Sequence, residues 1–207
     1  FIHSLSRNIF TDMKFDVIMP TVTLHDNCYT RLQQLYQPQA KVICQMGNIH
    51  QTTELQHVLH NAPYTPKPGQ KVLYYHQELD LNLYKYVPVD TSKKAIYSMV
   101  NLLPDPHYYY GLKEGLPEVD MKAWGSSTPD GPLLGCRGVA EQMQNANIGL
   151  NVKEVIGMGH TVMGWFASGR PVITGMNKIR QYGMDLVKLF EPGVTCYDLD
   201  NGQDING

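Results

Sequence analysis

The fold class is indicated most clearly by residues 148–174, IGLNVKEVIGMGHTVMGWFASGRPVIT. The apolar run 148–152 predicts a buried strand, and the apolar positions between 160 and 168 predict a short helix that ends at Gly169. Residues 171–174 predict the next strand. A strand, a helix and a second strand of these lengths form a βαβ unit, which belongs to a parallel sheet.

The same alternation extends over the rest of the chain. Further strands are predicted at 15–20, 41–46, 95–100 and 119–124, and further helices begin at Asp26, at Pro106 and at 138–146. The tetrapeptide 53–56, TELQ, fits a capping box and predicts another helix, with Leu55, Val58 and Leu59 at helical spacing. Three prolines predict a loop at 61–69. We therefore expect an α/β protein with a Rossmann-like parallel sheet and helices on both faces.

Composition excludes several classes of protein. The 207 residues suffice for one large domain or two small ones. The net charge of −2 argues against a protein that mainly binds a nucleic-acid backbone, because such domains are usually basic. No apolar run reaches the roughly 18 residues of a membrane span, and no signal peptide is visible, so we expect a cytoplasmic protein. The four cysteines are scattered without zinc spacing, which indicates reduced thiols.

The loop 157–161, GMGHT, is the first candidate site. It follows a predicted strand, and open α/β sheets bind ligands at the carboxyl ends of their strands. The helix that begins near His160 offers free N–H groups and about half a positive charge, which suits a phosphate. The alternative is a glycine-rich turn that only connects two elements.

Two other motifs are weaker. Residues 126–128, SST, also follow a predicted strand, but with Pro129-Asp130-Gly131 they equally fit an ordinary turn. Residues 198–200, DLD, have the Asp-x-Asp pattern of a metal-nucleotide site, but they precede the turn signal Asn201-Gly202 near the end of the sequence given. His57 and His60 share one face of the expected helix and have no third ligand at a sensible spacing, so we do not expect zinc.

Residues 159–173 resemble a segment of GT-B glycosyltransferases, in the retaining group related to glycogen and sucrose synthases. The run 167–173, ASGRPVI, matches the family's small-residue, Gly, x, Pro, Val, Ile pattern, and residues 140–150 resemble the helix and strand before it. The resemblance covers roughly 94–200. It implies a nucleotide-sugar-binding Rossmann-like domain at 86–207 and a partial acceptor-side α/β domain at 1–85, which is a GT-B fold with an incomplete N-terminal domain.

The resemblance also implies an activity and its residues. The chain would transfer a sugar from a nucleotide-diphosphate sugar to an unidentified acceptor, without a metal or other cofactor. Donor phosphates would lie against the loop and helix start, at Gly157, Gly159, His160 and Thr161. Arg137, just before the helix 138–146, and Lys153, just after the strand 148–152, would add positive charge. The alternative is that both are solvated surface charges.

Candidate catalytic groups come from two places. His25 and Asp26 are similar to the His-Asp loop that faces the interdomain cleft in such enzymes, although Asp26 also fits a plain helix N-cap. The family usually carries two glutamates eight positions apart, and here those positions hold Ile156 and Gly164. Glu154 would replace the first only if the loop shifts.

A second function therefore stays open: a non-catalytic nucleotide- or sugar-binding relative that acts as a subunit or interaction module. A hydrolase or an oxidoreductase is disfavoured, because the chain has no G-x-S-x-G elbow and no G-x-G-x-x-G after a first strand.

Overall fold

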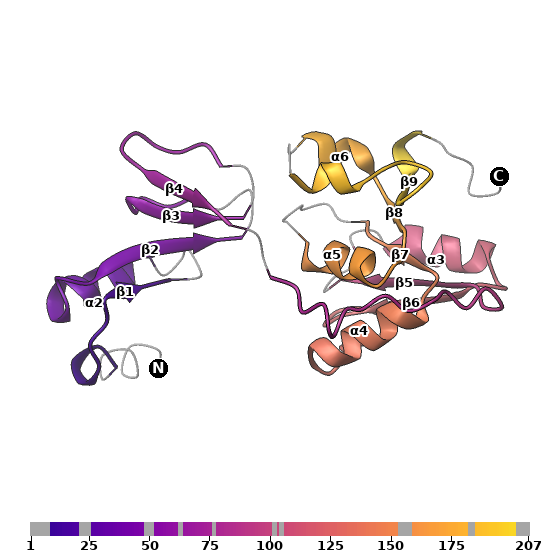
Figure 1. Ribbon diagram of the computed structural model, residues 1–207, viewed down its shortest axis with the longest axis horizontal. Helices are drawn as coiled ribbons and strands as arrows, with labels where there is room; N and C mark the ends of the chain where they lie inside the picture. Colours follow the sequence, from indigo (N-terminus) through magenta and orange to yellow (C-terminus); the bar gives the residue numbers. More distant parts are fainter. Residues whose placement is uncertain are drawn as a thin grey trace. The chain divides into compact units, whose positions relative to one another are not determined.

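The chain divides into two compact units, Phe1–His76 and Gln77–Gly207, and each contains its own parallel sheet (Figure 1). The computed structural model describes residues 9–20, 26–47, 52–61, 64–75, 78–100, 103, 106–152, 159–181 and 185–201. The expected α/β, Rossmann-like class is confirmed. Among these residues, no helix is long and apolar enough to cross a membrane.

The first unit contains a four-stranded sheet in the order β1-β2-β3-β4. Its strands are β1 (Val17–Ile18), β2 (Lys41–Met46), β3 (His57–His60) and β4 (Lys71–Tyr74), and all pairs are parallel. The helix α2 (Asp26–Tyr36) joins β1 to β2 and packs Tyr29, Leu32 and Tyr36 against Phe10 and Ile18. Leu35, expected on the same face of this helix, is instead 64% exposed.

The prediction of a helix over 53–60 is wrong. The Thr53 hydroxyl accepts a hydrogen bond from the Leu55 amide at 3.1 Å, which closes a short turn instead of capping a helix. The chain then enters β3, where Val58 lies between Cys44 and Val72. His57 and His60 are three positions apart on a strand and face opposite sides of the sheet, so they do not form the pair expected on a helix.

The second unit contains a five-stranded parallel sheet in the order β6-β5-β7-β8-β9. Its strands are β5 (Ala95–Met99), β6 (Asp120–Trp124), β7 (Ile148–Leu150), β8 (Val172–Thr174) and β9 (Cys196–Asp198). The helices are α3 (Pro106–Gly115), α4 (Gly135–Asn145), α5 (His160–Ala167) and α6 (Met176–Gln181), with short 3₁₀ turns η2 (Asp185–Leu189) and η3 (Leu199–Asn201). One core contains residues of α4 and α5 and the other contains Tyr109 of α3, so helices cover both faces, as expected.

An extended segment, residues 78–94, precedes β5, and we call it the strap. Side chains from α4 and the turn after it bind its carbonyl groups. Gln144 Nε2 donates to the Leu83 carbonyl at 3.0 Å, and Asn147 Nδ2 donates to the Asp90 carbonyl at 3.0 Å. The ring of Tyr84 is buried in the core of the unit. The strap is therefore part of this unit although it lies outside the sheet.

Arg170 fixes the strap to the end of α4. Its side chain is 1% exposed. Nε donates to the Ala146 carbonyl at 2.6 Å, and Nη2 donates to the Gln144 carbonyl at 2.6 Å. Nη1 donates to Val87 of the strap at 2.7 Å and to Ser168 at 3.0 Å. A buried cation is stabilised here by backbone oxygens that a helix leaves unpaired at its carboxyl end.

Candidate active site

The strand order of the second unit places a ligand crevice beside β5. The chain passes from β5 to β6 on one side and then crosses to β7 on the other side, after which β8 and β9 continue outward (Figure 1). Ligands of open α/β sheets bind outside the carboxyl ends of the strands, where the strand order reverses. The loops after β5, β6 and β7 therefore delimit the expected site.

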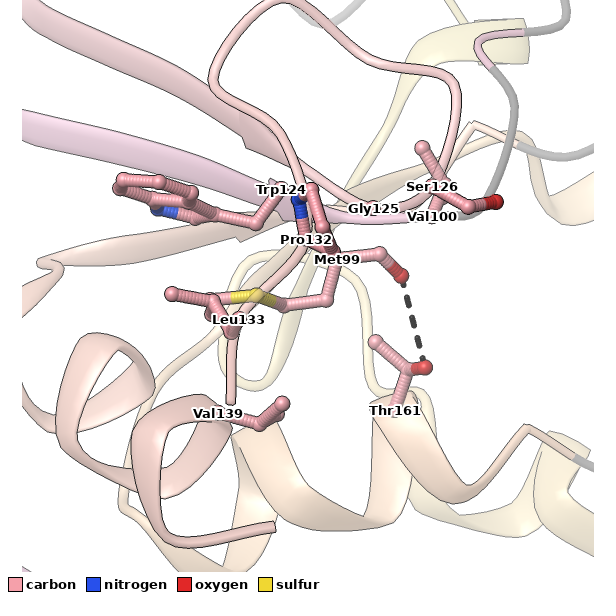
Figure 2. Close-up of a pocket in the computed structure, with 9 residues that line it drawn as sticks. All are labelled: Met99, Val100, Trp124, Gly125, Ser126, Pro132, Leu133, Val139 and Thr161. Atoms are coloured by element: carbon pink, nitrogen blue, oxygen red, sulfur yellow. Dashed lines mark hydrogen bonds between the residues drawn. The ribbon is translucent and has the colours of Figure 1, made fainter. Parts of the chain in front are cut away.

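A pocket lies at this edge, with a volume of about 310 Å³. It lies between the ends of β5 and β6, the loop after β6, α4 and the first turn of α5 (Figure 2). The residues that line it are Met99, Val100, Trp124, Gly125, Ser126, Pro132, Leu133, Val139 and Thr161. None of these residues carries a charged side chain, so the pocket suits an uncharged group.

The loop after β6 is a closed turn that supplies one wall of the pocket. Asp130 holds it, because its Oδ2 accepts a hydrogen bond from the Ala123 amide at 2.7 Å while its own amide donates to the Ala123 carbonyl at 3.2 Å. The Gly125 amide donates to the Gly131 carbonyl at 2.9 Å, and Gly131 has a φ of 75°, which glycine adopts without strain. The wall that carries Ser126 is thus preformed by local hydrogen bonds.

Among the residues that line the pocket, Trp124 has a buried side-chain N–H without a hydrogen-bond partner. Its indole Nε1 is inaccessible to solvent and makes no hydrogen bond. An unpaired buried N–H costs roughly 1–3 kcal/mol, and because solvent does not reach this one, an acceptor in the pocket could pair with it only after the ring had moved. Figure 2 shows the Trp124 ring among the residues that line the pocket.

The helix α5 places its amino end at the pocket. It begins at His160, as the sequence predicts, and Gly159 is its N-cap without a side-chain hydrogen bond. The Thr161 hydroxyl lies 3.5 Å from the Met99 carbonyl, which connects the first helical turn to the end of β5 (Figure 2). Trp165 packs directly on Gly149, where an added Cβ would lie 2.6 Å from the ring, so the helix lies close to the sheet.

Gly164 explains the missing second carboxylate. This residue is buried in the middle of α5, and an added Cβ would lie 2.8 Å from Met143 Sδ and 3.2 Å from the Tyr84 ring. A glutamate therefore has no room at this position in the described packing. Ile156, at the position of the first expected carboxylate, lies outside the described residues.

The structure brings together only part of the predicted site. Gly159, His160 and Thr161 lie at the start of α5, and Thr161 lines the pocket. Arg137 lies inside the first turn of α4, not before the helix, because α4 begins at Gly135; its side chain is exposed. Asp26 is the first residue of α2 in the other unit, and nothing is described of its side chain. The remaining predicted residues lie outside the described part of the chain: His25, Lys153, Glu154 and Gly157.

Residues 198–200 have a structural role. Asp198 is buried, and its Oδ1 accepts from the amides of Met176 and Asp200 at 3.2 and 3.0 Å. Asp200 Oδ2 accepts from the Asn177 amide at 2.6 Å. Both carboxylates thus bind amides at the start of α6, which is the arrangement of an N-terminal cap. Within the described ranges, no group of three or more His, Cys, Asp or Glu side chains is placed to hold a metal ion.

Sequence reasoning missed Trp124, Leu133 and Val139 as pocket residues. Trp124 carried a signal, because it ends a predicted strand and so belongs at the carboxyl edge of the sheet. The other two lie before and within α4, and only the strand order brings them to this edge.

Comparison with known proteins supports the fold. No family model and no curated protein matches the chain. Among solved structures, the chain is similar to one in the crystal structure of the GtfA/B complex, with 12% sequence identity and a TM-score of 0.55. The match covers 94% of this chain and 48% of that one, so this chain spans about half its length. At this identity the similarity shows the fold alone, an α/β fold with parallel sheets.

Proposed function

We propose that this chain acts in glycosyl transfer and binds a nucleotide-diphosphate sugar at the carboxyl edge of its second sheet. One observation carries the proposal: an uncharged pocket of about 310 Å³ lies beside the amino end of α5, where the strand order reverses. The glycosyltransferase-like fold agrees with it. Because residues 159–173 resemble retaining enzymes, the proposed transfer would keep the anomeric configuration of the donor sugar.

In this proposal the nucleoside occupies the pocket. Its lining has no charge to neutralise a diphosphate, and transfer of an unpaired phosphate into it would be costly. A heterocycle would make apolar contact with Leu133 and Val139. Aromatic rings also stack favourably on an indole.

The diphosphate then lies outside the pocket, at the start of α5. Backbone N–H groups of a helix start suit phosphate, and the loop and first turn would supply them at Gly157, Gly159, His160 and Thr161. Lys153 and Arg137 are the cations assigned to it in this proposal. No metal enters the scheme, because the helix and these cations would stabilise the leaving diphosphate.

A second candidate is a non-catalytic relative that binds the nucleotide or its sugar and serves as a subunit. The packing of Gly164 favours it, because α5 has no room there for a carboxylate. If the chain is catalytic, its acid and base groups come from His25, Asp26 or Glu154. Turnover, not binding, separates the two candidates.

Tryptophan fluorescence tests the binding site directly. The chain has two tryptophans, of which Trp165 is fully buried and Trp124 lines the pocket. Uridine and guanosine diphosphates, with their glucose and mannose conjugates, should quench Trp124. Trp124→Phe should abolish the quench and weaken nucleotide binding about tenfold by calorimetry, while inorganic pyrophosphate binding stays unchanged. Failure of every nucleotide to bind refutes the proposed function; a quench that persists in Trp124→Phe refutes only the pocket assignment.

Release of nucleoside diphosphate from the conjugates tests catalysis. Turnover that Glu154→Gln lowers at least tenfold, with unchanged donor binding, supports the transferase. Tight binding without any release of product identifies the non-catalytic candidate.

A further inference from the structure

The described parts of the connections between the strands of the first sheet lie on one of its two faces. Its four strands are parallel and follow one another in the order β1-β2-β3-β4. Crossovers between parallel strands are right-handed in nearly all proteins, so three successive steps in one direction place every connection on the same face. The contacts agree: α2 packs against Ile18, and Leu55 and Tyr64 from the two later connections pack with Cys44 and Val58.

The opposite face, which we call the open face, is set by the strand register. Its side chains lie in three rows across the sheet: Val17 and Lys41; Ile43, His57 and Lys71; Gln45, Leu59 and Leu73. Leu73 is 64% exposed and Val17 is 45% exposed, while Ile43 and Leu59 are half-buried. An apolar group thus extends over all four strands of this face.

A bare face is unusual for this kind of sheet. Parallel sheets are almost always covered on both faces, because each face buries apolar side chains against a helix. Of the described residues, Tyr75 reaches over this face from the end of β4, where its hydroxyl accepts a hydrogen bond from Gln45 Nε2 at 2.9 Å, but Leu73 and Val17 remain exposed. We therefore expect another helix to bind there.

The charges of the open face indicate which charges the bound helix would carry. Its ionisable side chains are Lys41, Lys71 and His57, and it includes no carboxylate. Neither lysine forms a salt bridge with any residue that the structure describes. A second copy of the same face would bring lysines against lysines, which costs free energy.

We propose that the open face binds an amphipathic helix of a partner protein, with an apolar stripe flanked by acidic residues. Three strand spacings of about 4.8 Å make the face about 14 Å wide, which a helix of about ten residues spans. Leu59 and Leu73 would lie against the apolar stripe, and Lys41 and Lys71 would pair with its acidic rim. This surface is independent of the nucleotide site proposed above.

A pair of synthetic peptides tests the proposal on the full chain. Both are 18-residue helices with leucines at positions i, i+3, i+4 and i+7; one has glutamates beside the stripe and the other has lysines. By fluorescence anisotropy, the acidic peptide should bind at least tenfold more tightly than the basic one at low salt. The difference should shrink at about 0.5 M salt, where charges are screened.

The chain offers a matched control. Leu73→Ser should weaken binding of the acidic peptide about tenfold, whereas Leu35→Ser on α2 should not change it, although both leucines are 64% exposed. Lys71→Glu should weaken the acidic peptide and strengthen the basic one, which a misfolded chain would not do. Urea unfolding of each variant verifies that it is folded.

Four results would overturn the proposal. These are equal affinity for the two peptides, equal effects of the two serine variants, no binding of either peptide, and a chain dimer in sedimentation that Leu73→Ser dissociates. The last result would identify a second copy as the occupant.

Discussion

Replacing Arg170 by methionine tests whether one buried side chain joins three segments of the second unit. Methionine keeps much of the aliphatic volume and removes every donor. The carbonyls of Gln144 and Ala146 at the end of α4, and of Val87 in the strap, would each lose a hydrogen bond. At 1% exposure, water does not reach the site to replace them.

The expected loss follows from those bonds. A hydrogen bond from a charged donor contributes about 1.5–3 kcal/mol, so four of them would give about 6–12 kcal/mol if they were independent. Burial of the guanidinium offsets a large part of this, and removal of one member of a buried charged group typically costs about 3–5 kcal/mol. We expect Arg170→Met to lower the free energy of unfolding by that amount, a large fraction of the roughly 5–15 kcal/mol of a domain.

Urea unfolding followed by circular dichroism measures the effect. Arg170→Lys should recover no more than about half of the loss, because one ammonium does not reach carbonyls that lie around a planar guanidinium. Arg137→Met, at an exposed arginine, should change the free energy of unfolding by less than about 0.5 kcal/mol. The loss should be the same at pH 6 and pH 9, since arginine stays charged. A cost below about 1 kcal/mol for Arg170→Met, or wild-type stability for Arg170→Lys, would refute the reasoning.

Three further variants follow from the described contacts. Gly164→Glu should destabilise the chain by at least about 2 kcal/mol in thermal unfolding and should not create turnover, because the helix core has no space for a side chain; a stable variant with new activity contradicts this. Gly169→Ala combines a φ of 72° with a clash on Tyr86, so it should cost about 2–4 kcal/mol; Tyr86→Ala in the same chain should recover only the part of this cost that is due to the clash. Burial alone would raise the pKa of Asp120, but hydrogen bonds from the Tyr97 hydroxyl and a neighbouring lysine outweigh it and lower this pKa. The stabilisation from a lowered folded pKa is present above the unfolded value and is lost as the pH falls through the folded one. Asp120→Asn should therefore be less stable than wild type at pH 7, and in urea titrations the difference should shrink as the pH falls.

Local signals predicted the second unit well. The helix α3 begins at Pro106, and α5 begins at His160 and is followed by Gly169, because proline and glycine punctuate the chain where apolar periodicity changes. In these segments the local preference and the tertiary structure agree. Nothing comparable marks β9, whose three residues form a strand only by pairing with β8.

The strand β3 shows where such reasoning fails. Thr53 and the residues after it satisfy the pattern of a helix start, yet Val58 is 1% exposed between two neighbouring strands. Pairing on both sides outweighed a local preference of a few tenths of a kcal/mol per residue. A single sequence does not show which strands will become its neighbours.

The site was predictable in part for the same reason. The start of α5 follows from a glycine loop before a helical pattern, so the positions of His160 and Thr161 could be predicted. Burial of Arg170 could not, because arginine is mostly exposed and its acceptors lie in segments up to 83 residues away.

That separation also sets an order of events during synthesis. Val87 leaves the ribosome long before Arg170, and at about 5–20 residues per second the interval is about 4–17 s. Throughout that time the Val87 carbonyl lacks its Arg170 donor, and the ring of Tyr84 lacks the later-made part of its core. The strap therefore remains without this anchor until the stretch that contains Arg170 has been made.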